Sequence, residues 1–272
     1  MVDAINLSAQ TSTNLLALRR TTEAISISQE RLSTGLRVNS AIDDPITFFD
    51  ARGLTNRASD LQVLKDDIDQ AVSIAEVAVT GLESIEDLVE QMKGLALDAQ
   101  SDSSSTNRSK AAVQFNDLRS QLDNLATDAS FNATNLLKGS PGNLKVTFSE
   151  DGSSTLTISG IASDTSGLSI VAAASHWAAD TDIDGAINDL DSALTTQRSS
   201  ATIIGVSADL ISLGLDFVET LITQLEKGAG KLVNADLNAE SANLLTLQTR
   251  QQLGTISLSI AQDSDQAIFR LF

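Results

Sequence analysis

The 272-residue sequence contains no cysteine, no tyrosine, one histidine, one tryptophan and two prolines. The lack of cysteine excludes disulfides, thiolate nucleophiles and zinc sites with cysteine ligands. The single histidine, His176, excludes a metal site built from several histidines. We expect no metal and no cofactor. With so few aromatic residues and prolines, aromatic cages and proline-rich recognition segments are not expected either.

Basic residues are also scarce: 18 lysines and arginines stand against 36 aspartates and glutamates, for a net charge of −18. This balance argues against binding to nucleic acid or to an anionic membrane surface, because both need a basic face. No segment reaches 18 consecutive apolar residues, so a transmembrane helix is not expected. The first residues lack a basic stretch followed by an apolar one, so no cleaved secretory signal is expected.

Two long heptad stripes dominate the rest of the sequence. Apolar residues recur every seven positions from Leu54 to Ala96, with a second row three positions further on, and no proline interrupts them. A matching pair of rows runs from Ile187 to Leu232. Helices of roughly 70 Å need a partner along their whole length, so the two stripes predict one long antiparallel pair. The bundle core is expected to contain Leu54, Leu61, Ile68, Leu82, Ile85, Val89, Ile204, Ile211, Leu215, Val218, Ile222 and Leu225.

Between the two stripes the pattern changes twice. Heptad spacing over 111–129 predicts a third, shorter helix, and the serine-rich stretch 101–106 predicts the turn before it. From Leu144, alternating apolar residues on either side of Asp151-Gly152 indicate a β-hairpin whose connection is longer than two residues. Residues 160–182 are weakly patterned and are interpreted as a surface excursion. The fold class expected is therefore mainly α, a long antiparallel coiled-coil-like bundle with a small β-hairpin excursion.

Candidate catalytic groups are poorly placed in this pattern. Asp43-Asp44, Asp66-Asp67 and Glu86-Asp87 are adjacent carboxylates, and neighbours on a helix do not face the same way. His176 has no recognisable nucleophile beside it. The sequence therefore predicts no catalytic residue and no enzymatic activity.

The two ends of the chain differ from the middle in charge. Residues 1–35 carry three acids and three bases, and residues 235–272 carry four acids and two bases, so most of the net charge lies between them. Nearly neutral amphipathic ends suit burial among copies of the same chain, whereas an acidic middle suits solvent. The residues expected to make these assembly contacts are Leu15, Leu18, Ile25, Leu32, Leu258, Ala261, Ile268, Leu271 and Phe272.

Three stretches resemble the bacterial flagellin family. They are Gln29 to Asp44 (QERLSTGLRVNSAIDD), Phe131 to Leu137 (FNATNLL), and Gln248 to Phe272 with its apolar tail IFRLF. The resemblance covers roughly 1–138 and 183–272, and order, spacing and flanking heptads all agree. It implies a structural subunit that self-assembles with other copies of itself into the extracellular flagellar filament used for swimming.

The resemblance also implies an organisation and a route of export. Residues 1–35 and 236–272 would form an inner coiled-coil domain of terminal helices, 36–138 and 183–235 a helical bundle domain, and 139–182 a β-hairpin with a variable surface insert. The chain would leave the cell through the flagellar type III apparatus without a cleaved signal peptide. Its further partners would be hook-junction and cap proteins and an export chaperone.

Two alternatives remain open from the sequence. Asp43-Asp44-Pro45-Ile46 is more similar to the hook–filament junction protein, a relative, than to many flagellins. A cytoplasmic coiled-coil adaptor would also show long heptads. Gln91 to Leu95 stands where many enteric flagellins carry an arginine-rich stretch that an innate immune receptor recognises, and the acidic residue of that stretch is replaced here by Gly94.

Overall fold

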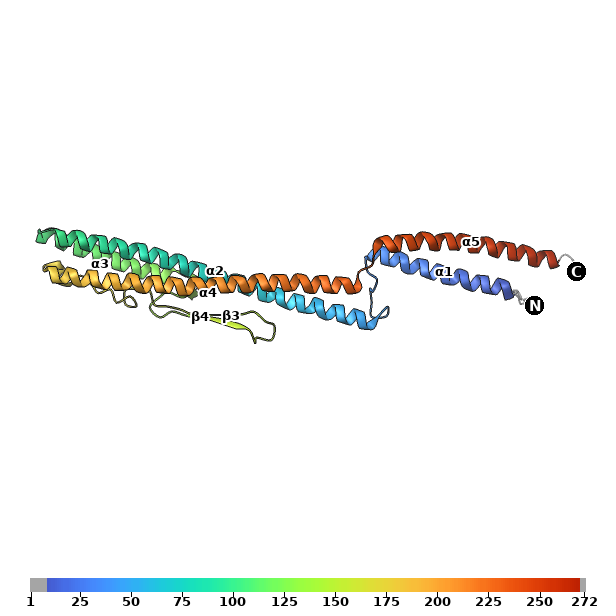
Figure 1. Ribbon diagram of the computed structural model, residues 1–272, viewed down its shortest axis with the longest axis horizontal. Coiled ribbons are helices and arrows are strands. Elements are labelled where there is room, and N and C mark those ends of the chain that lie inside the picture. The colour runs from blue at the N-terminus through green and yellow to red at the C-terminus, as the bar shows by residue number, and fades with distance from the viewer. Residues whose placement is uncertain (1–8, 270–272) are drawn as a thin grey trace. The chain divides into compact units, whose positions relative to one another are not determined.

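The computed structural model describes residues 9–269, with side chains from 11 to 264. The fold is mainly α, with two small antiparallel strand pairs, which confirms the predicted class (Figure 1). The helices are α1 (Ala9–Thr34), α2 (Pro45–Ser101), α3 (Ser105–Asp128), α4 (Asp180–Val233) and α5 (Leu237–Phe269), with a short 3₁₀ helix η1 (Ala174–Trp177). The strands are β1 (Ser130–Phe131), β2 (Thr134–Asn135), β3 (Asn143–Thr147) and β4 (Thr155–Ser159).

The chain forms two compact units. The central unit is the continuous stretch Arg57–Thr223, and the terminal unit consists of the residues before and after it. The long helices α2 and α4 each begin or end in one unit and continue into the other. Each unit is described separately below.

In the central unit, α2 and α4 pack as an antiparallel pair with α3 beside them (Figure 1). Their contact is the predicted seam of heptad residues: Ile68, Leu82 and Ile85 of α2 are fully buried, as are Ile204 and Ile211 of α4. α3 begins where the serine-rich turn was predicted, because the Ser104 side chain accepts a hydrogen bond from the Asn107 amide as an N-cap. The seam shows that heptad spacing determined the helical core.

Asn135 closes the end of α3. Its side-chain amide donates to the carbonyls of Ala126 and Thr127 at 2.9 Å each, and its oxygen accepts from the amides of Leu137 and Lys138. These four bonds satisfy a buried polar side chain and the last carbonyls of the helix together. The short β1–β2 pair is part of this turn.

The longer hairpin joins β3 and β4, with Val146 opposite Leu156. Val146 and Ile158 are buried on one face, as the alternating pattern predicts, and seven residues connect the strands. The Asp151 carboxylate accepts from the hydroxyls of Ser149 and Ser153 at 2.7 Å each and from the Ser153 amide at 3.1 Å. The expectation of a hairpin with a long connection is therefore confirmed.

The interpretation of residues 160–182 as a surface excursion was wrong. Ser163, Leu168, Ile170 and Trp177 are all buried, and the Trp177 ring packs 5.0 Å from the Phe115 ring of α3. The segment is held mainly through its backbone, which heptad or period-two analysis does not detect. The bonds come from α3: Asn116 accepts from the Ala173 amide, Arg119 donates to the Ile170 carbonyl, and Asp123 accepts from the Thr165 amide.

In the terminal unit, α1 and α5 form an antiparallel pair (Figure 1). Where the last turns of α1 meet the first turn of α5, the Ser28 hydroxyl donates to the buried Glu240 carboxylate at 2.6 Å. Next to α1 the chain turns at Gly35, whose φ of +73° favours glycine, and its carbonyl accepts from the Ala235 amide at 2.9 Å. These bonds tie the start of α5 to the end of α1.

The helix that follows, α2, begins at Pro45 with Asp44 as its cap. The Asp44 carboxylate accepts from the Thr47 amide at 3.2 Å and from the Thr47 hydroxyl at 2.6 Å. Aspartate at the cap and proline in the first helical position are both favoured, because the first amides of a helix have no partner inside it. The Asp43-Asp44-Pro45 run is thus a helix start.

Candidate assembly surfaces

The residues predicted for assembly lie mostly on the seam between α1 and α5. Ile25 is buried, while Leu18, Leu32, Leu258 and Ala261 are half-buried, so within one chain these side chains already pack against the partner helix. Leu15 alone among those described is exposed, at 38 %. The side chain of Ile268 and the residues Leu271 and Phe272 lie outside the described part of the chain.

The outer side of α5 carries a second apolar face that the sequence analysis missed. Leu245, Leu253, Ile256 and Ile260 are all between 56 and 66 % exposed. At 100° per residue they fall within one face of the helix, opposite the side that bears Leu258. Their spacing of eight, three and four residues is the sequence signal of this face, and it lies outside the heptad stripe that contains Leu258. α5 is therefore apolar on two opposite sides.

α4 shows a comparable outer stripe in the central unit. Ile203, Val206, Leu210, Leu213 and Phe217 follow one another at steps of three and four residues, and each is at least half exposed. Together with the buried seam, this stripe makes part of α4 apolar and long enough to cross a membrane by length and composition, although only 17 % of that stretch is buried. A stripe at these steps is the kind of helix face that packs against another helix.

A groove of about 920 Å³ lies beside this stripe, between α4, α2 and the hairpin connection. Its walls include Leu61, Leu156, Leu213 and Phe217. The hairpin connection is attached to the helices at two points. The ring of Phe148 lies directly over Gly214, and Glu150 accepts a hydrogen bond from Arg57 at 2.6 Å. A backbone hydrogen bond, and after it the bond from Arg57, lowers the pKa of the Glu150 carboxyl.

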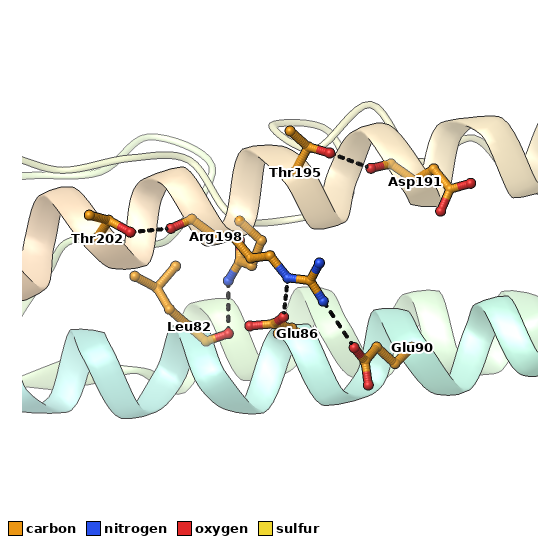
Figure 2. Close-up of polar contacts among 8 residues, drawn as sticks. Leu82, Glu86, Glu90, Asp191, Thr195, Arg198 and Thr202 are labelled. Carbon is orange, nitrogen blue, oxygen red and sulfur yellow. Dashed lines mark hydrogen bonds and ion pairs between the residues drawn. The ribbon is translucent and has the colours of Figure 1, made fainter.

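Charged residues cross the seam between α2 and α4 on one flank (Figure 2). Arg198 bridges Glu86 at 2.7 Å and Glu90 at 3.2 Å, and Lys93 contacts Asp191 at 2.5 Å. Hydrogen bonding to Glu86 raises the pKa of Arg198. Beneath them Gln197, fully buried at a core position, donates to the Leu82 carbonyl at 2.9 Å. The side-chain oxygen of Gln197 has no partner among the described residues.

The predicted bundle core lies on the buried side of these helices. Within α2 and α4, all of its members are buried except Leu54 and Leu215, which are half-buried. Leu54 belongs to the terminal unit and Leu215 to the central unit.

Many hydroxyls on these helices donate to their own backbone. Along α5 the side chains of Ser241, Thr246 and Thr249 each donate to the carbonyl four residues earlier, and Thr21 and Thr22 of α1 do the same. Such bonds satisfy the hydroxyl proton without a tertiary partner. These five hydroxyls therefore need no partner outside their own helix.

Three of the six carboxylates of the adjacent pairs, Asp43, Asp44 and Glu86, have structural partners. Asp43 accepts from the amides of Asn39 and Ser40, and Asp44 caps α2, and these bonds lower the pKa of both groups. His176 is exposed in a left-handed turn. Within the described residues, no group of three acidic or histidine side chains could hold a metal ion.

The chain is similar in sequence to proteins of one bacterial family. Residues 5–141 match the family model of the bacterial flagellin N-terminal helical region, and residues 183–272 match that of the C-terminal helical region. The chain is 33 % identical to Flagellin FljO of Caulobacter vibrioides over all of this chain and 99 % of that protein. It is 29 % identical to a flagellin of Brucella melitensis over 96 % of this chain and 95 % of that one.

Among solved structures, the chain resembles Bacillus cereus flagellin with a TM-score of 0.50 at 18 % identity. The match covers 56 % of this chain and 88 % of that one, and at this identity it supports the fold alone.

Proposed function

The chain belongs to the bacterial flagellin family, and from that premise we propose that the outer face of α5 is the main surface through which one copy binds the next. As a flagellin it is a structural subunit that polymerises into the extracellular flagellar filament for swimming motility. The observation that carries the proposal is the second apolar face of α5, Leu245, Leu253, Ile256 and Ile260, which nothing covers within the described chain.

The size of this face supports a role in polymerisation. Full burial of a large aliphatic side chain contributes roughly 1.5–3 kcal/mol. Four such side chains on one helix, repeated in every copy, outweigh the mutual repulsion that a weakly charged helix contributes. Along α5 only Glu240, Arg250, Asp263 and Asp265 are charged. We also propose that the remaining predicted assembly residues, including Ile268, Leu271 and Phe272 near the C-terminus, contribute to polymerisation.

We propose the following organisation for the assembled subunit. Residues 1–35 and 236–272 form the coiled-coil domain of terminal helices, 36–138 and 183–235 form the helical bundle domain, and 139–182 supply the hairpin with the segment that follows it. The breaks between α1 and α2 and between α4 and α5, close to residues 35 and 235, support this division. The predicted bundle core, Leu54 to Leu225, then stabilises the subunit itself.

The proposed partners other than copies of itself follow from family membership. They are hook-junction and cap proteins and an export chaperone, with export through the type III apparatus and no cleaved signal peptide. We also propose that the chain has no catalytic activity: Asp43 serves as a turn acceptor, Asp44 as a helix cap, and Glu86 as an ion-pair partner of Arg198. Neither the matched family nor the structure favours the junction protein or a cytoplasmic adaptor.

The test replaces two outer residues of α5, Leu253→Asn with Ile260→Asn. Monomer helicity by circular dichroism should be unchanged, because both side chains are exposed in the single chain. Electron microscopy of protein seeded with filament fragments should show no elongation.

The matched control replaces Gln252→Asn and Gln262→Asn, two exposed polar positions on the same helix. This control should polymerise normally. Filaments of ordinary length from the apolar-to-Asn variant would contradict the proposal.

A further inference from the structure

The apolar seam between α2 and α4 does not define a unique alignment. Its core positions recur every seven residues on both helices, for example the fully buried Ile68, Leu82 and Val89 on α2 and Ile204 and Ile211 on α4. If α4 moved along α2 by seven residues, apolar side chains would again meet apolar side chains. The hydrophobic contact therefore permits at least two wrong registers, one in each direction.

Polar pairs on one flank of the seam follow the same repeat. Four such pairs cross from α2 to α4 at equal spacing within the central unit, with neighbouring pairs separated by 21, 7 and 7 residues on both helices, and Glu90 adds a second contact to Arg198 at 3.2 Å. The four pairs are Lys65 with Glu219 at 2.9 Å, Glu86 with Arg198 at 2.7 Å, Lys93 with Asp191 at 2.5 Å, and Gln100 with Asp184. Because the spacing is equal on both helices, all four belong to one antiparallel register.

The order of charge in this ladder distinguishes the registers. In the observed alignment Glu86 meets Arg198 and Lys93 meets Asp191. A shift of seven residues in one direction would place Lys93 opposite Arg198. A shift in the other direction would place Glu86 opposite Asp191, and would also bring Lys93 opposite Asp184. Each wrong register thus creates a contact between like charges, and the first also removes the attractive partner of Lys93.

We propose that the four charges of Glu86, Lys93, Asp191 and Arg198 select the pairing register of α2 and α4. They are positioning residues, and they supply a specificity that the apolar core lacks. Gln197 does not make this selection. Its bond goes to a main-chain carbonyl, and every turn of α2 offers an equivalent carbonyl.

The register matters for the assembled protein because it positions the outer stripe of α4. A slip of seven residues would displace that stripe by roughly 10 Å along α2 and the hairpin. The contact of Phe148 with Gly214 would then be lost. A copy with the wrong register would present a different outer surface to its neighbours.

The absence of cysteine makes the register directly measurable by disulfide formation. Two positions in the gap of the ladder, Val72 and Val79 on α2, line one groove with Gly205 and Ser212 on α4. Val72 is opposite Ser212 in the observed register, whereas Val79 meets Ser212 only after a slip of seven residues. Disulfides require Cα atoms closer than about 7 Å, so each cysteine pair reports one register.

The experiment refolds full-length monomer carrying either Val72→Cys with Ser212→Cys or Val79→Cys with Ser212→Cys under mild oxidation. With the natural charges, only the first pair should crosslink. Reversal of the α2 charges, Glu86→Lys with Lys93→Glu, makes the observed pairs at 86 and 93 repulsive. It makes attractive the slipped register that the second cysteine pair reports, in which residue 93 meets Arg198. We expect the ratio of slipped to observed crosslink to rise by about tenfold, because two exposed pairs, each of small energy, are reversed together.

Two further variants keep the result interpretable. The α4 reversal Asp191→Arg with Arg198→Asp, added to the α2 reversal, should restore the original crosslink pattern even if the α2 reversal alone folds poorly. The control Gln197→Leu should leave the pattern unchanged. An unaltered pattern in the α2-reversed protein, or failure of the compensating variant to restore it, would overturn the proposal.

Discussion

Gly214 lies beneath the ring of Phe148, at the point where the hairpin connection meets α4. A Cβ atom at this position would overlap the ring carbons, whereas a Cβ at Gly205, nine residues earlier on the same helix, would meet nothing within 4 Å. Two glycines of one helix therefore serve different purposes. One makes room for a tertiary contact, and the other only lowers helix propensity.

This difference gives a paired prediction. Gly205→Ala should stabilise the protein against urea by about 0.5–1 kcal/mol, because alanine is the better helix former. Gly214→Ala should lose that gain and displace Phe148, so amide hydrogen exchange over residues 148–154 should accelerate. Equal stabilisation by both substitutions, with unchanged exchange in the hairpin, would show that the Phe148 contact is unimportant.

Asp151 organises the same connection by charge. Hydrogen bonds from the hydroxyls of Ser149 and Ser153, with one from the Ser153 amide, lower its pKa from 3.8 to about 2. A lowered folded-state pKa means that the stabilisation is complete above pH 3.8 and is lost as the pH falls through 2.

We predict that the Ser153 amide signal in NMR titrates with a midpoint near pH 2. The variant Asp151→Asn has no carboxylate to protonate, so the same signal should stay flat between pH 4 and 2. A midpoint at 3.8 in the natural protein would mean that the three hydrogen bonds do not hold the carboxylate in its charged form.

At the scale of elements, the segment between β4 and α4 fixes α3 in place. Trp177 inserts against Phe115, and the surrounding backbone bonds come from the polar face of α3. Three consecutive residues, Ser175 to Trp177, have left-handed backbone angles, which L-residues adopt only where packing compensates. Here the burial of the Trp177 ring against Phe115 compensates for the cost of these backbone angles.

Truncating this ring should be costly. Trp177→Ala is expected to destabilise the protein by about 3–5 kcal/mol, measured by urea unfolding followed by circular dichroism. Trp177→Phe should cost less, because it keeps an aromatic contact with Phe115 and removes an indole N–H that has no partner in the described chain. A loss below about 1 kcal/mol for the alanine variant would contradict the role given to the segment.

Periodicity predicted the helices and the hairpin, whose apolar side chains repeat at fixed spacing. It did not predict the segment that is held by hydrogen bonds to its backbone. Ile68 and Ile204 lie on strict heptads, and Val146 and Ile158 alternate around a turn, so both helices and the hairpin were predictable. Thr165 is held through its backbone by Asp123, a contact 42 residues apart that no local pattern encodes. The outer face of α5 is visible in the sequence as the spacing of Leu245, Leu253, Ile256 and Ile260, but it lies beside the stripe of Leu258, which alone was taken as the apolar face of this helix.

At the scale of the whole molecule, a net charge of −18 must be packed against identical neighbours. Repulsion among the acidic middles opposes polymerisation, and the apolar faces of the helices favour it. Salt acts on both effects, but in distinguishable ways. The Debye length falls from about 30 Å at 0.01 M to about 8 Å at 0.15 M, while sulfate additionally strengthens apolar burial.

Polymerisation followed by light scattering should therefore be slow in low salt, faster in moderate sodium chloride, and fastest in sulfate at equal ionic strength. The variant Asp66→Lys with Asp67→Lys should show a weaker dependence on chloride and still polymerise, since these exposed residues lie beside the seam. Faster polymerisation at low salt than at high salt would mean that repulsion is not the barrier.

The hydroxyls that donate to their own helix have a consequence for assembly. Along α5, Ser241, Thr246 and Thr249 keep their protons on the backbone of the same helix, so these three hydroxyls need no acceptor from a neighbouring copy. A neighbour that covers the apolar face of α5 can therefore bury them without leaving a donor unsatisfied, and the contact avoids the desolvation penalty of an unpaired hydroxyl.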